Sequence, residues 1–407
     1  MSKQHLVIVG AGIVGLATAY HLQKRFPHLA ITLLEKEASI AQHQSSHNSG
    51  VLHSGIYYRP GSLKARLCRE GKQQMEQFCL QKNIPYERCG KLIIATSPEE
   101  LPVLRTLYER GQMNGVQCAL LSDKELQHIE PHARGIKAIH VPEAGIVDFY
   151  QVCLKLAEHF QEKGGTLRLN HLVKRARIRG NSVHIHTSQG RLEADYLINC
   201  AGLYADVLAQ HSGIQVPVRI IPFRGEYFQL KPEFRHLCRG LIYPVPDPSF
   251  PFLGIHLTRT IHKTVLCGPN AVLACAREGY TRSRIHPGEC LQTLTYPGFI
   301  KLAARYWRTG IEELLRSWSK EAFVRALQRM VPEITSEMLT SAPAGVRAQA
   351  LSPDGQLVDD FLFIRTPRML HVCNAPSPAA TSSLRIGEWI CQEATQLFEG
   401  LSSTTHR

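Results

Sequence analysis

The strongest constraint on the fold lies in the first 35 residues, which are typical of a strand, a glycine turn, a helix and a second strand. Leu6–Val9 is a short apolar run, as expected for a parallel strand that is buried on both faces. A G-x-G-x-x-G sequence, Gly10–Gly15, follows at once, a helical period covers Leu16–Phe26, and the apolar run Ile31–Leu34 ends at Glu35. In this context the glycines predict a dinucleotide-binding unit and therefore an α/β fold.

Each residue of this motif has its own physical role. Gly10 permits the tight turn, Gly12 lets the backbone approach a pyrophosphate, and Gly15 lets the helix pack closely on the strand. The start of the helix offers N–H groups without intrahelical acceptors, and a positive dipole end, to the phosphates. Glu35 would accept hydrogen bonds from ribose hydroxyls, which disfavours a 2′-phosphate and therefore NADP.

The rest of the chain favours FAD over NAD. A simple NAD-binding domain would continue its βαβ rhythm, whereas residues 40–66 form a long polar stretch rich in His and Ser. Further candidate cofactor contacts lie at the end of a predicted strand, Asn199–Gly202, and before the last predicted helix, Asn374–Thr381. The start of that helix suits the electron-rich edge of a reduced flavin. A site assembled from both ends of the chain fits the longer cofactor, FAD.

Composition excludes several other classes of protein. The chain has 407 residues, of which 44% are hydrophobic and 20% charged, which argues for a sizeable core and against disorder. Its apolar runs fall short of the roughly 20 residues that span a bilayer. The first residues lack the features of a secretory signal, so we expect a cytoplasmic protein. The twelve cysteines are scattered, without a C-x-x-C pair, so we expect neither a disulfide framework nor a metal site.

The formal net charge of +13 favours an acidic partner. Aromatic residues make up only 7% of the chain and the basic residues are dispersed, so we expect no nucleic-acid partner, and nucleic-acid binding stays a remote alternative. Residues 301–330 are rich in Lys and Arg, and Ile311–Met330 has the period of one amphipathic helix. This segment is either a solvated helix face or a patch that contacts an anionic membrane, here the cytoplasmic face of the inner membrane.

Further elements are predicted along the chain. Helices are expected at residues 64–83, at two places between 96 and 147, at 150–163 and at 384–398. Strands are expected at residues 91–95, 167–169, 195–200, 362–364 and 370–373, with a hairpin around 179–182 and a β-rich stretch over 219–300.

Several longer segments resemble the L-2-hydroxyglutarate dehydrogenase/oxidase family, which belongs to the D-amino-acid-oxidase-like FAD oxidoreductases. They span nearly the whole chain: His43–Tyr58, Pro60–Ala65, Pro222–Phe228, Phe252–Arg259, Gly268–Ala274, Gly345–Ala350 and Asn374–Ser382. The chain has Ser46 and Ser54 where Gly and Ala are expected in the family, and Ser54 follows His53 directly.

The resemblance implies a glutathione-reductase-type, Rossmann-like FAD-binding domain and a β-rich α+β substrate domain. The FAD-binding domain would comprise residues 1–90, 148–218 and 338–401, and the substrate domain residues 91–147 and 219–337. The expected cofactor contacts are Gly10, Gly12, Gly15, Glu35, Lys36, Ser45, Asn48, Ser49, Gly50, Val173, Ala201, Gly202, Pro378, Ala379, Ala380 and Thr381.

The resemblance also implies oxidation of (S)-2-hydroxyglutarate to 2-oxoglutarate, with the C2 hydride passing to flavin N5 and electrons then passing to a quinone or oxygen. A sister specificity, for an amino acid or glycerol 3-phosphate, is the alternative.

A dicarboxylate substrate needs fixed cations, and Arg can hold a carboxylate through two parallel hydrogen bonds. The expected substrate-contacting residues are Arg347, Arg224, Arg259, His256 and Tyr58. Together with Arg347, His53 is the expected catalytic residue, because a histidine suits the removal of a hydroxyl proton. His47 competes with it for that role.

Overall fold

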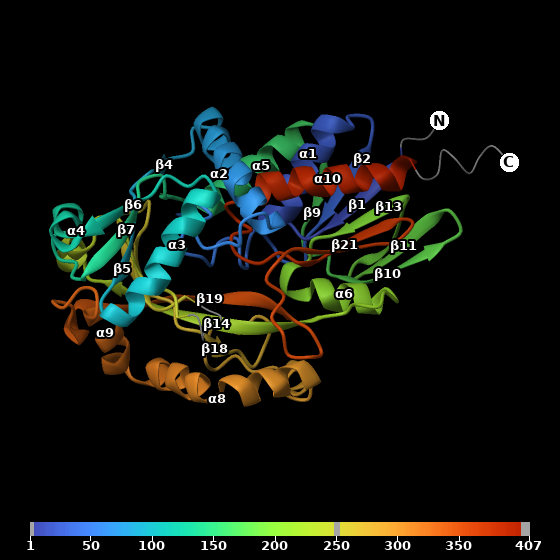
Figure 1. The fold of residues 1–407 in the computed structure, drawn as a ribbon. Helices are drawn as coiled ribbons and strands as arrows, with labels where there is room; N and C mark the ends of the chain where they lie inside the picture. Colours follow the sequence, from blue (N-terminus) through green and yellow to red (C-terminus); the bar gives the residue numbers. More distant parts are fainter. Residues whose placement is uncertain (1–3, 248–252, 400–407) are drawn as a thin grey trace.

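The structure, a computed structural model, describes residues 4–247 and 253–399, and two large sheets organise them (Figure 1). Phe252 of the family segments, Met1–Lys3 and residues 400–401 of the expected FAD-binding domain lie outside the described residues. The mixture of sheets and helices confirms the predicted α/β class.

The first sheet has six strands in the order β20-β21-β13-β1-β2-β9. Their bounds are β1 His5–Val9, β2 Ala30–Leu34, β9 Thr166–Arg168, β13 Tyr196–Asn199, β20 Leu362–Arg365 and β21 Met369–Asn374. All neighbours pair in parallel except β20, which is antiparallel at one edge. The sheet therefore joins strands from the start, middle and end of the chain.

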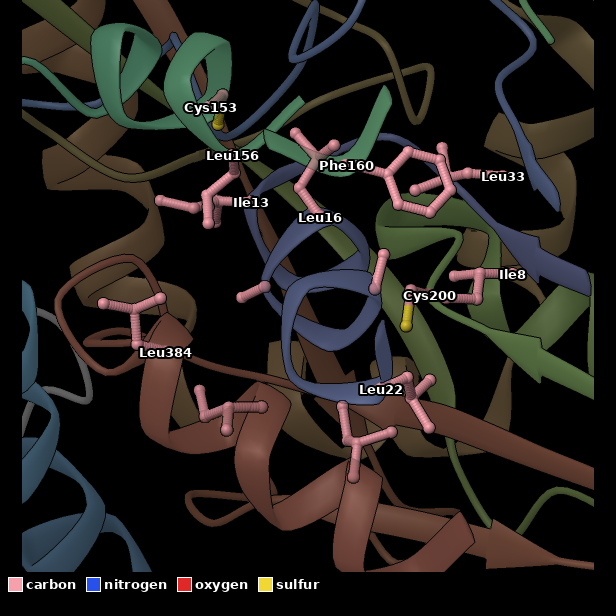
Figure 2. Packing of buried hydrophobic residues seen from close by; sticks show 14 of the residues in the cluster. Ile8, Ile13, Leu16, Leu22, Leu33, Cys153, Leu156, Phe160, Cys200 and Leu384 are labelled. Carbon is pink, nitrogen blue, oxygen red and sulfur yellow. The ribbon is translucent and has the colours of Figure 1, made fainter. Parts of the chain in front are cut away.

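Helices cover one face of this sheet. They are α1 Ile13–Arg25, α2 Leu63–Gln81, α5 Phe149–Glu162 and α10 Ser383–Glu399. Leu16 and Leu22 of α1 are fully buried, and Figure 2 shows them among side chains from α5, α10 and the sheet, including Phe160 and Leu384. Every residue of β1 after His5 is buried, as the apolar run predicts.

The other face is covered by a three-stranded sheet, β10 Val173–Arg179, β11 Ser182–Thr187 and β12 Gly190–Ala194, and by α6 Ala205–His211. The β10–β11 turn confirms the predicted hairpin.

The second large sheet has the order β18-β14-β17-β16-β15-β5-β7-β6, with β19 paired to β14. Its strands are β5 Lys91–Ala95, β6 Ala119–Ser122, β7 Lys137–Val141, β14 Arg219–Leu230, β15 Leu241–Pro244, β16 His256–Arg259, β17 Val265–Gly268, β18 Val272–Leu273 and β19 Leu339–Leu351. Helices α3 Leu101–Met113 and α4 Asp123–Ile129 pack against its β5–β7 part. A small sheet, β3 Val51–Leu52, β8 Gly145–Val147 and β4 Tyr86–Glu87, completes the strands.

The segment 338–401 contributes to both large sheets. β19 pairs along β14 in the second sheet, whereas β20 and β21 lie in the first. The expected boundary at 338 assigns β19 to the FAD-binding domain, although this strand pairs within the second sheet. The division into two domains stays a prediction.

The prediction of one helix over Ile311–Met330 is wrong. The structure has α8 Pro297–Trp318 and α9 Lys320–Gln328, preceded by α7 Pro287–Leu294. Ser319 separates α8 from α9 with extended backbone angles, and its hydroxyl accepts a hydrogen bond from Ala322 N at 3.2 Å, an N-cap that begins the second helix. The predicted apolar stripe is therefore divided: Phe323 is 1% exposed, whereas Trp318 is 77% exposed.

Candidate active site

The glycine turn between β1 and α1 has the geometry that its sequence predicts. Gly10 has φ +100°, and an added Cβ there would lie 2.5 Å from the carbonyl oxygen of Cys200. An added Cβ on Gly15 would lie 2.0 Å from the carbonyl oxygen of Gly10, so this glycine lets α1 pack against the turn. At Gly12 the nearest atom to an added Cβ is Ser45 Oγ at 3.2 Å, so the backbone here is less enclosed.

The end of β2 presents Glu35 to this turn. The Glu35 side chain is buried, and its two oxygens accept hydrogen bonds from Ala11 N at 2.7 Å and Glu37 N at 3.0 Å. Each carboxylate oxygen keeps a further lone pair for a ribose hydroxyl. Lys36, in contrast, forms ion pairs with Glu37 and Glu278, which occupy its ammonium in this structure.

The polar stretch after β2 is tied to the start of α1. Ser45 Oγ accepts a hydrogen bond from Ile13 N at 2.9 Å, which satisfies one of the amino-terminal N–H groups of α1. The Asn48 amide donates to the carbonyl oxygen of Ser45 at 2.9 Å and accepts from Gly50 N at 2.9 Å. Gly50 has φ +72°, and an added Cβ would lie 2.6 Å from the Val147 carbonyl oxygen.

Segments from the middle and end of the chain meet the same region. Ala201 and Gly202 follow β13, and an added Cβ on Gly202 would lie 3.6 Å from Gln44 Oε1. Val173 begins β10 two residues after His171, whose N–H donates to the Glu35 carbonyl oxygen at 2.7 Å.

The loop Pro378–Thr381 contacts β3 and the residue that follows it. Thr381 is fully buried, its hydroxyl donates to the Val51 carbonyl oxygen at 3.1 Å, and it accepts from His53 N at 3.2 Å. Pro378, Ala379 and Ala380 lead into this contact.

These features fit an extended FAD. The start of α1 faces the glycine turn, the Glu35 carboxylate retains acceptor capacity, and the loops that contain His53 and Thr381 touch each other. A pyrophosphate would be held by the N–H groups at the helix start, and the adenosine ribose by Glu35. The individual contact residues stay predictions.

His53, the expected catalytic residue, directly follows β3. Its Nδ1 is buried and has no hydrogen-bond partner within the described part of the chain. Burial lowers the pKa of His53 well below its usual value, and the charges of Lys91, His256 and Lys64 lower it further. A neutral imidazole with a buried, unpartnered nitrogen can accept a proton.

Arg347 and His256 approach each other on the second sheet. Burial lowers the pKa of His256 to about 3, and the charges of Lys91 and Arg347 contribute to this shift. The His256 Nδ1 contacts the Gly254 carbonyl oxygen at 2.8 Å. Arg347 Nη1 donates to the Asn270 carbonyl oxygen at 3.1 Å, which fixes the guanidinium beside Tyr227. Burial raises the pKa of Tyr227, and the nearby charge of Arg347 and the Ser49 side chain lower it, so the polar stretch 40–66 lies close to the second sheet here.

Two other expected substrate contacts, Arg224 and Arg259, have partners within the protein. Arg224 is buried and pairs with Glu226 through Nη2 at 3.0 Å. Arg259 pairs with Glu87 and donates from Nε to the Arg239 carbonyl oxygen at 2.6 Å, so its guanidinium has protein partners.

Tyr58 lies under the Lys64 ammonium, 4.9 Å from the centre of its ring. Its role, like those of Arg224 and Arg259, stays a prediction. His47, the competitor of His53, packs against the ring of Tyr280 at 4.4 Å between ring centres.

Sequence reasoning missed three residues that surround this region: Lys91, Tyr57 and Tyr243. The Lys91 ammonium lies 4.1 Å from the centre of the Tyr243 ring and 5.2 Å from that of Tyr57, and the Tyr243 ring stacks on His256 at 3.8 Å. The signal was a lysine at the start of the apolar run Lys91–Ala95, a position that a buried strand usually gives to an apolar residue.

Known proteins resemble this chain over nearly its whole length. The family model described as FAD dependent oxidoreductase matches residues 5–393. The chain is 49% identical over 395 residues to an L-2-hydroxyglutarate dehydrogenase of Indibacter alkaliphilus, with 97% of this chain and 99% of that protein covered. It is 46% identical over 416 residues to the human mitochondrial L-2-hydroxyglutarate dehydrogenase, with 98% of this chain and 90% of that protein covered.

Solved structures share the fold. An L-α-glycerophosphate oxidase from Mycoplasma pneumoniae with FAD bound has a TM-score of 0.79 at 22% identity, covering 98% of this chain and 95% of that chain. A glycine oxidase from Geobacillus kaustophilus has a TM-score of 0.71 at 19% identity, covering 97% and 95%. Together with the near-full-length identities above, this places the chain in the L-2-hydroxyglutarate dehydrogenase family of FAD-dependent oxidoreductases.

Proposed function

We propose that this chain oxidises (S)-2-hydroxyglutarate to 2-oxoglutarate with FAD as its cofactor. The observation that carries the proposal is the position of His53, whose N–H donates to Thr381 Oγ1 and whose pKa is lowered by burial and by the nearby charge of His256, while the charge of Arg347 lowers the pKa of His256. The names of the relatives at 45–49% identity support the same substrate.

In this proposal the chain supplies charge and a proton acceptor. The Arg347 guanidinium binds one carboxylate of the substrate and orients C2. His53 is neutral before the reaction, because burial lowers its pKa, and its unpartnered Nδ1 accepts the proton of the C2 hydroxyl. When bound, FAD supplies the acceptor of the C2 hydride. Loss of the proton and the hydride converts the alcohol into the ketone.

The structural neighbours named for glycerophosphate and glycine define the competing specificities. The test is anaerobic reduction of the purified flavoprotein, followed by the loss of its visible flavin absorbance. (S)-2-hydroxyglutarate should bleach the flavin, whereas the R enantiomer, glycine and glycerol 3-phosphate should not. Bleaching by glycine or glycerol 3-phosphate alone would replace the proposed substrate.

The electron acceptor in our proposal is a quinone or oxygen, and a membrane contact would favour the quinone. Within the described ranges, no helix combines the length and apolar character needed to cross a bilayer. Helix α8, however, runs along the outer edge of the molecule beyond β14, β18 and β19 (Figure 1). Large apolar side chains are exposed on α7, α8 and the residues before them: Ile285, Leu291, Leu294, Ile300, Trp307, Ile311, Leu314, Leu315 and Trp318.

Basic residues accompany this apolar surface. Lys301, Arg305 and Arg308 are exposed on α8 beside Trp307. Apolar and tryptophan side chains combined with Lys and Arg on one amphipathic helix are typical of contact with an anionic membrane surface. We therefore include peripheral attachment through α8 in the proposal.

Sedimentation with vesicles tests the attachment. The wild type should sediment at low salt with vesicles that contain phosphatidylglycerol and less with pure phosphatidylcholine, and Trp307→Glu with Trp318→Glu should abolish the difference. Met113→Glu, at an exposed site on α3, is the matched control and should still sediment. A wild type that stays in the supernatant, or a dimer that the paired substitution dissociates, would show that this face does not bind membrane.

A further inference from the structure

A buried lysine without an anionic partner lies in the neighbourhood of His53. Lys91 begins β5 and is 1% exposed, and its ammonium contacts the rings of Tyr243 and Tyr57. The hydrogen bonds and ion pairs of the described residues give this ammonium no carboxylate. Buried lysines in proteins are almost always paired, because transfer of an unpaired charge out of water costs several kcal/mol. An unpaired one beside a reaction site is a candidate for binding an anion.

The sheet places Lys91 in a row with the groups assigned to the substrate. Leu241 pairs with Lys91 on one side and with Thr258 on the other, so Tyr243, two residues further, lies on the same face as Lys91. The Tyr243 ring stacks on His256, with an angle of 21° between the rings.

Arg347 lies on β19, which comes after β16 and His256 in the order of the strands counted from β5, and its charge lowers the pKa of His256. In the order of the strands, buried Lys91 on β5 and half-buried Arg347 on β19 therefore lie on either side of His256 on β16. A dicarboxylate has two negative ends and a neutral middle, which matches this order of charges.

Other polar atoms at the Lys91 end also lack partners. The hydroxyl of Tyr57 and Nδ1 of His53 are buried and have no hydrogen-bond partner in the described ranges. The Tyr57 ring packs on the Lys91 ammonium, so the ammonium and the phenol belong to neighbouring side chains. An ammonium and a phenol are both donors, and a carboxylate is an acceptor for both.

We propose that Lys91 determines the preference for a dicarboxylate, by binding, with help from Tyr57, the substrate carboxylate that Arg347 does not hold. The inference rests on the proposed function and names a contact within it. A binding role of Lys91 differs from an indirect role, in which Lys91 acts only by lowering the pKa of His53. A binding role affects substrates with a second carboxylate, whereas the indirect role affects every hydroxy acid alike.

The test compares (S)-2-hydroxyglutarate with (S)-2-hydroxybutyrate, which has the same hydroxy-acid end and no second carboxylate. In Lys91→Met holoenzyme, kcat/KM for (S)-2-hydroxyglutarate should fall by about 30-fold or more, mainly through KM, because a charged partner is lost. For (S)-2-hydroxybutyrate it should change by less than about threefold. Lys137→Met, on the exposed part of β7, is the control and should change neither value. Equal losses on both substrates would overturn the inference.

Inhibition of the wild type gives a second test that needs no lysine variant. Burial lowers the pKa of Lys91 to about 7, an effect that the nearby thiols of Cys68 and Cys89 oppose. The groups around it keep their charge between about pH 6 and pH 9. Burial lowers the pKa values of His53 and His256 and raises those of Tyr57, Tyr243, Cys68 and Cys89.

Glutarate should therefore inhibit more weakly as the pH rises through 7, since the ammonium that binds it is lost, while inhibition by butyrate should stay constant. Tyr57→Phe should weaken inhibition by glutarate several-fold and leave butyrate unchanged. A parallel pH dependence of both inhibitors would overturn the inference. Failure of the proposed function is distinguishable, because then (S)-2-hydroxyglutarate would not reduce the wild-type flavin at all.

Discussion

At the scale of single residues, burial sets the chemistry of the candidate site. His53 and His256 both have pKa values held below 6.5 first by desolvation and then by neighbouring cations. When the His256 Nδ1 carries the proton that the Gly254 carbonyl oxygen accepts, the Nε2 of this ring is an acceptor. The site is therefore positively charged through Arg347 and Lys91 rather than through its histidines.

The lowered pKa of His53 predicts an unusual dependence of the reaction rate on pH in the acidic range. A general base with an ordinary histidine pKa would lose activity as the pH falls through about 6.5. Because the folded-state pKa of His53 is lowered, its neutral form persists below that pH, and kcat/KM should not fall between about pH 7 and pH 5.5. Initial rates with an artificial dye acceptor measure this directly. A tenfold decline centred near pH 6.5 would show that the base is another group.

Removal of the imidazole is the complementary prediction. His53→Ala should lower the rate of flavin reduction by about 100-fold to 10,000-fold and leave FAD bound, since the backbone N–H of residue 53 still donates to Thr381. Stopped-flow reduction under anaerobic conditions is the measurement, and His47→Ala is the comparison. Reversed effects in the two variants would assign the base to His47.

The sequence was informative about residues whose role depends on local geometry and less so about those whose role depends on the sheet. Gly10 and Gly15 follow from a turn and a close helix contact that six residues define. Lys91 could be predicted only as part of a strand, because its neighbours Tyr57 and Tyr243 come from other strands and loops. No short sequence pattern specifies which residues of neighbouring strands lie opposite each other in the second sheet.

At the scale of elements, the first sheet and its helices follow closely from apolar periodicity, and the α8–α9 region does not. The helical period of the apolar residues predicted a single helix across α8 and α9. In the structure, Ser319 caps the start of α9 and so begins a new helix. The exposed side chains on α8, among them Trp307 and Ile311, show that a helical apolar stripe need not face the core.

The close contact at the start of α1 predicts a sharp difference between two Gly→Ala substitutions. Gly15→Ala places a Cβ 2.0 Å from the Gly10 carbonyl oxygen, so α1 must move away from the turn. We expect loss of bound FAD, measured as the ratio of visible to ultraviolet absorbance. Gly310→Ala, in α8, meets no atom within 4 Å and should leave the FAD content unchanged. Full FAD content in Gly15→Ala would contradict the assigned role of this turn.

At the scale of the whole molecule, a buried ion pair joins the two sheets. Asp206 of α6 is 1% exposed and pairs with Arg277, with one nitrogen–oxygen distance of 2.6 Å and a second of 2.9 Å. The same carboxylate accepts a hydrogen bond from Ile220 N of β14 at 2.9 Å. Helix α6 covers the first sheet and β14 belongs to the second sheet. The Asp206 carboxylate therefore connects the two sheets.

Asp206→Asn should therefore destabilise the protein strongly. The substitution leaves the Arg277 guanidinium buried without its counter-charge, and we expect the free energy of unfolding to fall by about 3 kcal/mol. Urea unfolding of the FAD-saturated protein measures the change. Glu158→Gln, which removes an exposed ion pair with Lys155, is the control and should cost less than about 0.5 kcal/mol. A similar loss of unfolding free energy in both variants would show that the Asp206 ion pair does not connect the two sheets.

The hydrogen bonds of Thr381 have a consequence for the order in which the protein is made. Its hydroxyl joins the backbone at Val51 and at His53, about 330 positions earlier in synthesis, and β21 pairs inside the first sheet. A nascent chain on the ribosome therefore carries its glycine turn long before it can close the pocket around the cofactor. Loading with flavin should accordingly follow the synthesis of β21 and Thr381.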